Sequence, residues 1–315
     1  MFVEILLLII GLVLLVKGAD FFVEGSSSIA KTLKIPPLII GLTLVSIGTS
    51  LPELSVSITS SINGLNDMSF GNVIGSNIFN TLIVIGCSAL ILPLTIHKNI
   101  FKFDLPISFL IYILLILFSF VISPYEISLV ESIILIIIFI TYIVTLIIRE
   151  KKENYEATQI KDRKLPVSIV LTVIGIIGVI VGGNFVVNSA SKIASSLGMS
   201  ELLVGLTIVA IGTSLPELVT SVIASKKHQN DIAIGNAIGS NIFNVLFILG
   251  LSSSLNTIKI DNSIWFDLVI LLISTVILFI FSIKDKTIKR YHGLILILVY
   301  VVYFTYIIIR NIGLF

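Results

Sequence analysis

The polar positions of this chain divide a mostly apolar sequence into ten long segments. Each segment has about 20 residues and few charges, which is the length an α-helix needs to cross the hydrocarbon part of a bilayer. The pattern predicts membrane spans at 2–23, 37–62, 68–91, 104–122, 127–148, 166–190, 201–225, 231–253, 263–283 and 291–311. We therefore expect an all-α polytopic membrane protein with ten transmembrane helices.

Composition supports this fold class and excludes several others. Only 12% of the 315 residues are charged and 56% are hydrophobic, whereas soluble domains carry roughly 25% charged residues. The single cysteine, Cys87, excludes an intrachain disulfide. The chain has no Cys/His cluster typical of zinc sites. We expect a lipid bilayer around the protein, with no organic cofactor, no nucleic acid and no evident protein partner.

Two stretches of the chain have nearly the same sequence. Residues 41–86 and 205–250 align without a gap at an offset of 164, and 27 of the 46 positions are identical. Because each half has five spans, an odd number, the second half must enter the membrane from the opposite side, as in transporters with inverted repeats. The predicted division is a first repeat at 1–148 (core 37–91), a linker at 149–165 and an inverted second repeat at 166–315 (core 201–253).

The basic residues predict the orientation. One set of connections holds 16 of the 20 lysines and arginines, and the other side holds Lys192, Lys259 and Arg310. Cytoplasmic loops carry the excess of basic residues. The bias predicts a cell-membrane protein with both termini extracellular and the 149–165 linker cytoplasmic.

Each repeat carries one glutamate, Glu53 or Glu217, near the middle of an apolar span. A charge at this depth is costly and marks a functional site by default. Pro52 and Pro216 precede the glutamates and remove a backbone donor, which predicts a broken helix. Carboxylates, hydroxyls and freed carbonyls form an oxygen-rich site of the kind that hard cations prefer.

Amides occupy matching positions in the next span of each repeat. Asn80 and Asn244 end the motif Gly-Ser-Asn-Ile-Phe-Asn, and Ser76 and Ser240 lie one helical turn before them. Inverted symmetry would bring these residues and the glutamates together around one axis. Two carboxylates balance one divalent cation, and Ca²⁺ accepts six to eight oxygen ligands more readily than Mg²⁺ does.

The paired Gly-Thr-Ser-Leu-Pro-Glu and Gly-Ser-Asn-Ile-Phe-Asn motifs closely resemble the two alpha repeats of the sodium/calcium exchangers, of the prokaryotic ten-helix type. The resemblance implies Ca²⁺/Na⁺ exchange by alternating access, with Ca²⁺ and Na⁺ as transported substrates, Ca²⁺ export as the expected direction, and no enzyme activity. It implies that the first and sixth spans slide across the core. The ligands implied by the motifs are Glu53, Glu217, Asn80, Asn244, Ser76 and Ser240, oxygens of Thr49, Ser50, Thr213 and Ser214, and the carbonyls of Ser46 and Ala210.

One departure from some relatives bears on the ions. Potassium-dependent exchangers have an aspartate where this chain has Asn244, so K⁺ cotransport is not expected and the site has two acidic ligands. Three Na⁺ per Ca²⁺ would then make exchange electrogenic. The alternatives are a Ca²⁺/H⁺ exchanger on the same frame, a passive cation channel and, least favoured, an intramembrane enzyme.

The same polar and glycine residues also have purely structural interpretations. The two glutamates could form a protonated structural pair, and the asparagines could serve packing. For Ser57, Ser61, Ser221 and Ser225 we favour hydrogen bonds between helices, and for the two Gly-x-x-x-Gly motifs close helix packing. Lys17 and Asp20, three residues apart, predict a local ion pair.

Overall fold

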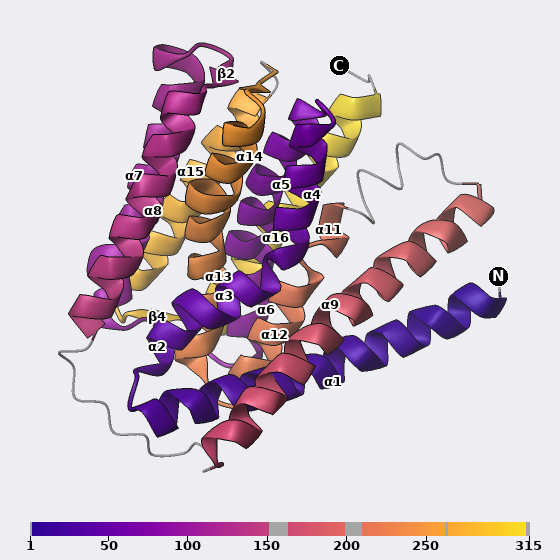
Figure 1. Ribbon diagram of the computed structural model, residues 1–315, viewed down its shortest axis with the longest axis vertical. Coiled ribbons are helices and arrows are strands. Elements are labelled where there is room, and N and C mark those ends of the chain that lie inside the picture. The colour runs from indigo at the N-terminus through magenta and orange to yellow at the C-terminus, as the bar shows by residue number, and fades with distance from the viewer. Residues whose placement is uncertain (1, 151–162, 199–209, 262–263, 313–315) are drawn as a thin grey trace.

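The computed structural model describes residues 2–150, 163–198, 210–261 and 264–312, and most of them are helical (Figure 1). Apolar helices dominate because, in a bilayer, each backbone amide must find its partner within the segment. The first half comprises α1 (Phe2–Leu33), α2 (Pro37–Ile40), η1 (Gly41–Val45), α3 (Ser46–Thr49), α4 (Leu51–Ile62), α5 (Asn66–Phe79), η2 (Asn80–Val84), α6 (Ile85–Ile91), β1 (Leu94–Thr95), η3 (Ile100–Asp104), α7 (Leu105–Leu117), η4 (Phe118–Ile122), β2 (Glu126–Ile127) and α8 (Leu129–Glu150). The elements labelled η are π-helical turns within longer helices.

The described part of the second half repeats this order. It comprises α9 (Leu165–Ser196), α11 (Ala210–Gly212), α12 (Leu215–Lys226), α13 (Asn230–Phe243), η6 (Asn244–Leu249), α14 (Gly250–Leu255), β3 (Ile258–Lys259), α15 (Ile264–Ile283), β4 (Thr287–Ile288) and α16 (Arg290–Ile312).

The predicted spans are found where the structure describes them. Eight are helices long and apolar enough to cross a membrane, and the predicted span 37–62 is a pair of helices bent by 48°. The predicted span 201–225 is described from residue 210 onward, as α11 and α12. The ten-helix fold expected from the sequence is therefore confirmed.

Helices α1 and α9 are longer than predicted and lie side by side (Figure 1). Each has 32 residues, about 48 Å of helix, which exceeds the ~30 Å hydrocarbon layer and requires a tilt or an extension into the interface. Their backbones touch through glycines: a Cβ placed on Gly18 would lie 2.6 Å from the backbone nitrogen of Val179. This seam joins the two helices into one tightly packed pair.

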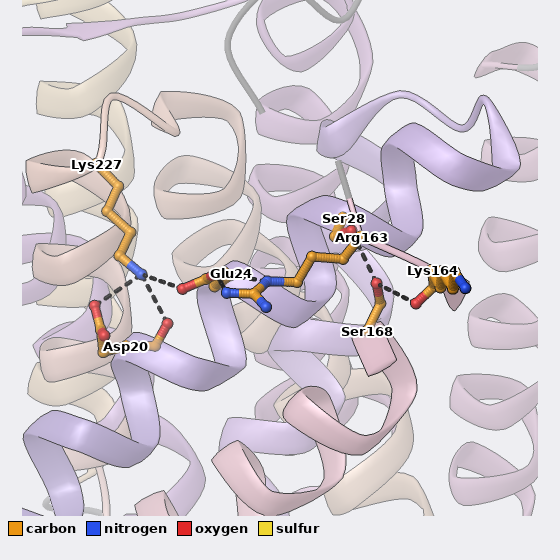
Figure 2. A network of polar contacts seen from close by, with 7 residues as sticks. All are labelled: Asp20, Glu24, Ser28, Arg163, Lys164, Ser168 and Lys227. Carbon is orange, nitrogen blue, oxygen red and sulfur yellow. Dashed lines mark hydrogen bonds and ion pairs between the residues drawn. The ribbon is translucent and has the colours of Figure 1, made fainter. Parts of the chain in front are cut away.

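A cluster of charges connects this pair to the rest of the protein (Figure 2). Lys227, which follows α12, places Nζ 2.7 Å from Oδ1 of Asp20 and donates to the Asp20 carbonyl at 2.8 Å. Glu24 accepts hydrogen bonds from Arg163, which precedes α9. The predicted local pair between Lys17 and Asp20 is wrong, because Asp20 pairs instead with a lysine from the other half of the chain.

Four short strands reveal how the two halves are oriented. Strand β1 pairs with β4, and β2 pairs with β3, both antiparallel. Strands β1 and β3 are equivalent at the offset of 164, yet they pair at opposite ends of the helices α7, α8 and α15, where Figure 1 places β4 and β2. Equivalent elements at opposite ends are what an inverted repeat produces.

Two matching clamps hold the outer helices. Asp104, the last residue of η3, accepts hydrogen bonds from Tyr142 and from Arg149 of α8. In the second half Asp267 accepts a hydrogen bond from Tyr303 and forms an ion pair with Arg310, and both partners are on α16. Asp267 is therefore buried against these partners.

Candidate cation site

The site begins where two helices break. Ser50 and Ser214 have φ and ψ of −87° and 11°, and of −92° and 7°, which end α3 and α11 and start α4 and α12. Pro52 and Pro216 lie in the first turn of the new helices, where a missing N–H costs least. The predicted breaks are present at both repeats, and they put the glutamates in the first turn after each break.

The two carboxylates are bound crosswise by serines from the opposite repeat. Ser50 Oγ donates a hydrogen bond of 2.7 Å to Glu217 Oε1. Ser214 Oγ donates one of 3.1 Å to Glu53 Oε1, and Ser76 Oγ lies at 3.5 Å from the same oxygen. Each glutamate is thus positioned by the break of the other repeat, and the two acidic groups share one polar centre.

Several buried oxygens of the predicted ligands have no hydrogen-bond partner in the described part of the chain. Glu53, Glu217, Asn80 and Asn244 are fully buried. The unpartnered oxygens are Glu53 Oε2, Glu217 Oε2, Asn80 Oδ1, Asn244 Oδ1 and Thr213 Oγ1. Burying polar oxygens without partners costs free energy, and a bound cation is the group that would offset that cost.

The remaining predicted ligands lie around the same helix breaks. Ser46 O accepts hydrogen bonds from Ser240 Oγ at 3.3 Å and from Thr49 Oγ1 at 3.3 Å. Ser214 Oγ also lies 3.1 Å from Ser76 Oγ. Ala210 is the first described residue of α11, and its side-chain surroundings lie outside the described part of the structure.

Sequence reasoning missed a pair of supporting asparagines. Asn72 Nδ2 donates to the carbonyl of Glu53 at 3.2 Å and to Ser57 Oγ at 2.9 Å. Asn236 Nδ2 makes the same two contacts with Glu217 and Ser221, at 3.3 and 2.9 Å. The signal was available, because Gly-Asn precedes the second motif in both repeats.

The two candidate amide ligands begin stretches of altered helix. Asn80 is the first residue of η2 and Asn244 the first of η6, both π-helical. Turns of π-helix inside α-helices occur frequently at functional sites. The wider turn changes the direction of the side chains after each asparagine, and nothing in the sequence indicated it.

The predicted packing roles are partly confirmed. Ser57 and Ser221 bond the asparagines of the following helix, and Ser61 Oγ donates to the carbonyl of Ser252 at 2.6 Å. Ser225 Oγ has no hydrogen-bond partner in the described part of the chain. Gly235 and Gly239 lie against the backbone of 41–42. The equivalent contact of Gly71 and Gly75 would fall on 201–209, outside the described residues.

The predicted ligand set contains two acidic side chains, Glu53 and Glu217. Among the described residues there is no group of three or more His, Cys, Asp or Glu side chains that could hold a metal ion. Two carboxylates with neutral hydroxyl, amide and carbonyl oxygens are the kind of ligands that hard cations prefer.

Comparison with known proteins identifies the family. A family model described as "Sodium/calcium exchanger protein" matches residues 3–148 and 167–309. The chain belongs to the sodium/calcium exchanger family. The putative antiporter CaxA of Alkalimonas amylolytica is 37% identical over 96% of this chain and 98% of its own. The sodium/calcium exchanger MaX1 of Methanosarcina acetivorans is 33% identical over 96% of this chain and 97% of its own.

A solved structure of the sodium-calcium exchanger NCX_Mj has the same fold. It superposes with a TM-score of 0.84 at 34% identity and covers 96% of this chain and 98% of that one. The resemblance seen in the motifs is therefore confirmed, and the structural match covers 96% of the chain. The protein is a multi-pass membrane transporter of the cation/Ca²⁺ antiporter class, and not an enzyme.

Proposed function

We propose that this protein exchanges Ca²⁺ for Na⁺ across the cell membrane by alternating access, and that it exports Ca²⁺. The observation that carries the proposal is the pair of fully buried glutamates, Glu53 and Glu217, held crosswise by Ser214 and Ser50. The relatives support the coupling ion: MaX1 is named a sodium/calcium exchanger, and NCX_Mj structures were soaked with Na⁺ and Ca²⁺.

The proposed ligands are those of the two repeats. Glu53 and Glu217 supply the negative charge, and the unpartnered oxygens of Asn80, Asn244 and Thr213 complete a shell of hard ligands. The other contributors are Ser76, Ser240, Thr49, Ser50 and Ser214, and the carbonyls of Ser46 and Ala210. One Ca²⁺ neutralises the two carboxylates, so the loaded site can be carried through a low-dielectric barrier at a lower cost. Three Na⁺ would leave a net charge of +1 and make exchange electrogenic.

The proposed arrangement in the membrane follows from the basic residues. Repeats at 1–148 and 166–315 are joined by a cytoplasmic linker at 149–165, with both termini outside. The end of α8 at Glu150 and the start of α9 at Leu165 support these boundaries. Arg163, which belongs to that linker, lies in one cluster with Lys227 (Figure 2), and this grouping of basic residues supports the cytoplasmic assignment.

The test is Ca²⁺ uptake into proteoliposomes loaded with Na⁺, compared with an imposed proton gradient and with no gradient. We expect uptake only with outward Na⁺, and its loss in Glu53→Gln and in Glu217→Gln. Uptake that follows the proton gradient would assign Ca²⁺/H⁺ exchange instead. Uptake without any gradient of a counter-ion, still selective for Ca²⁺, would mean a channel and would contradict alternating access.

A further inference from the structure

Asn80 and Asn244 are equivalent by sequence, but their surroundings differ. Asn244 Nδ2 donates a hydrogen bond of 3.0 Å to Asn77 Oδ1. The equivalent contact would join Asn80 to Asn241, and it is not made: Asn80 Nδ2, Asn80 Oδ1 and Asn241 Oδ1 all lack a partner in the described part of the chain. One amide of the site is therefore held in place and the other is not.

The orientation of Asn244 follows from a chain of obligatory contacts. Asn77 Nδ2 lies 3.0 Å from the backbone carbonyl of Asn241, which only accepts, so that atom of Asn77 must be the donor. The Oδ1 atom of Asn77 therefore faces Asn244, and because this oxygen only accepts, Asn244 must donate its NH₂ group to it. The oxygen of Asn244 is left buried and without a partner in the described part of the chain.

We propose that Asn77 is a positioning residue that requires an amide at position 244, and so keeps the candidate site at two carboxylates by excluding a third. The inference rests on the proposed function of the site. A carboxylate at 244 would bring an acceptor against Asn77 Oδ1 in a buried setting, which repels unless the carboxylate takes up a proton. Asn77 thereby selects a neutral oxygen ligand at this position.

The asymmetry has a source in the sequence. Thr81 donates its hydroxyl to the carbonyl of Asn77 at 2.9 Å, and Thr81 Oγ1 accepts from Asn241 Nδ2 at 2.9 Å. Asn241 Nδ2 thus donates to a side chain, whereas Asn77 Nδ2 donates to a backbone carbonyl, and the carbonyl of Asn77 accepts from Thr81 instead. The residue equivalent to Thr81 is Val245, which has no hydroxyl to divert Asn77. The Thr81/Val245 difference therefore separates a held amide at 244 from a free one at 80.

The experiment measures Ca²⁺ binding to the full-length protein in detergent, and in parallel the Ca²⁺ concentration for half-maximal uptake into liposomes. Asn244→Asp is compared with Asn80→Asp, which makes the same chemical change at the unheld position. We expect Asn244→Asp to weaken Ca²⁺ binding at least tenfold at neutral pH, and Asn80→Asp to tighten it, because Asn80 Nδ2 and Oδ1 make no hydrogen bond in the described part of the chain and no fixed acceptor opposes the added carboxylate. Equal effects of the two variants would overturn the proposal.

A rescue variant separates positioning from general damage. Asn77→Ser replaces the fixed acceptor with a hydroxyl that donates or accepts, so Asn77→Ser/Asn244→Asp should bind Ca²⁺ within about threefold of Asn77→Ser alone. Thr81→Val should make Asn80→Asp as harmful as Asn244→Asp, because it restores the equivalent contacts. Lack of rescue in variants whose thermal unfolding matches that of the parent would contradict the role of Asn77.

The binding readout keeps this inference apart from the proposed function. If the parent protein binds Ca²⁺ but its uptake does not follow Na⁺, the coupling proposal fails, while the Asn77 proposal is still decided by binding. A parent protein that binds no Ca²⁺ would overturn both.

Discussion

Ser50 Oγ donates a 2.7 Å hydrogen bond to Oε1 of Glu217, although the two residues are 167 positions apart. Ser214 makes the reciprocal contact with Glu53. The helix break of one repeat is therefore part of the acidic centre of the other. Neither repeat could form this centre by itself, so its geometry depends on how the two halves pack.

Removing one of these hydroxyls should disturb the centre strongly. A hydrogen bond to a charged group contributes about 1.5–3 kcal/mol, so Ser50→Ala should raise the Ca²⁺ concentration for half-maximal exchange roughly tenfold or more. Ser50→Thr keeps the hydroxyl and should retain most of the affinity. Uptake into Na⁺-loaded proteoliposomes measures both.

A buried serine outside the centre provides the control. Ser88 is 1% exposed and its hydroxyl has no hydrogen-bond partner in the described residues, so Ser88→Ala should leave exchange within about twofold of the parent value. If Ser50→Ala behaves like Ser88→Ala, the crosswise contact does not position Glu217.

The glycine seam between α1 and α9 predicts a difference between two Gly→Ala changes. A Cβ on Gly18 would lie 2.6 Å from the backbone of Val179, so the helices would have to separate. We expect Gly18→Ala to cost about 2 kcal/mol of stability. Gly183 of α9 serves as the comparison, because a Cβ placed on it would lie 3.7 Å from Pro216, which is an ordinary van der Waals contact. Gly183→Ala should therefore be neutral or slightly stabilising, since alanine favours helix over glycine.

Thermal unfolding in detergent, followed by the loss of the monodisperse peak, compares the two variants. Equal unfolding temperatures of Gly18→Ala and Gly183→Ala would mean that the close approach of α1 and α9 does not contribute to stability.

The sequence was sufficient for the features that a bilayer makes costly. Apolar runs located the spans. Glu53 and Glu217 stood out because burying a carboxylate at that depth costs free energy and marks a functional site by default. The prolines before them indicated the breaks for the same local reason. These predictions required no knowledge of which distant segments meet.

Contacts between distant segments could not be read from the sequence. The bond from Asn72 to the Glu53 carbonyl needs the angle at which α5 crosses α4. Asp20 had a lysine within reach on its own helix, but it pairs with Lys227 because α12 ends beside α1. Spacing along one helix describes local neighbours only, and the packing of the repeats decided both contacts.

The pairing of Lys227 with Asp20 should be measurable by a double-mutant cycle. Both side chains are partly exposed, at 29% and 38%, so we expect a coupling of about 0.5–1 kcal/mol. The cycle uses Lys227→Met, Asp20→Asn and the double variant, each measured by thermal unfolding. The coupling should shrink at high salt, because ions screen exposed charges. Strictly additive effects at low salt would contradict the pairing.

The clamp of Asp104 and Arg149 should contribute more, because it is less accessible. The side chain of Asp104 is fully buried and that of Arg149 is 15% exposed, with the guanidinium 4.9 Å from the centre of the Phe103 ring. Arg149→Met removes the cation that faces a buried carboxylate, and breaking such a pair costs about 3–5 kcal/mol. We expect a large fall in unfolding temperature in detergent.

The equivalent clamp gives a graded comparison. Arg310 and Asp267 are more exposed, at 26% and 10%, so Arg310→Met should destabilise less than Arg149→Met. The double variant Asp104→Asn/Arg149→Met should recover much of the lost stability, because no unpaired charge is then buried. If the double variant is as unstable as Arg149→Met, the loss comes from the packing of the arginine stem and not from its charge.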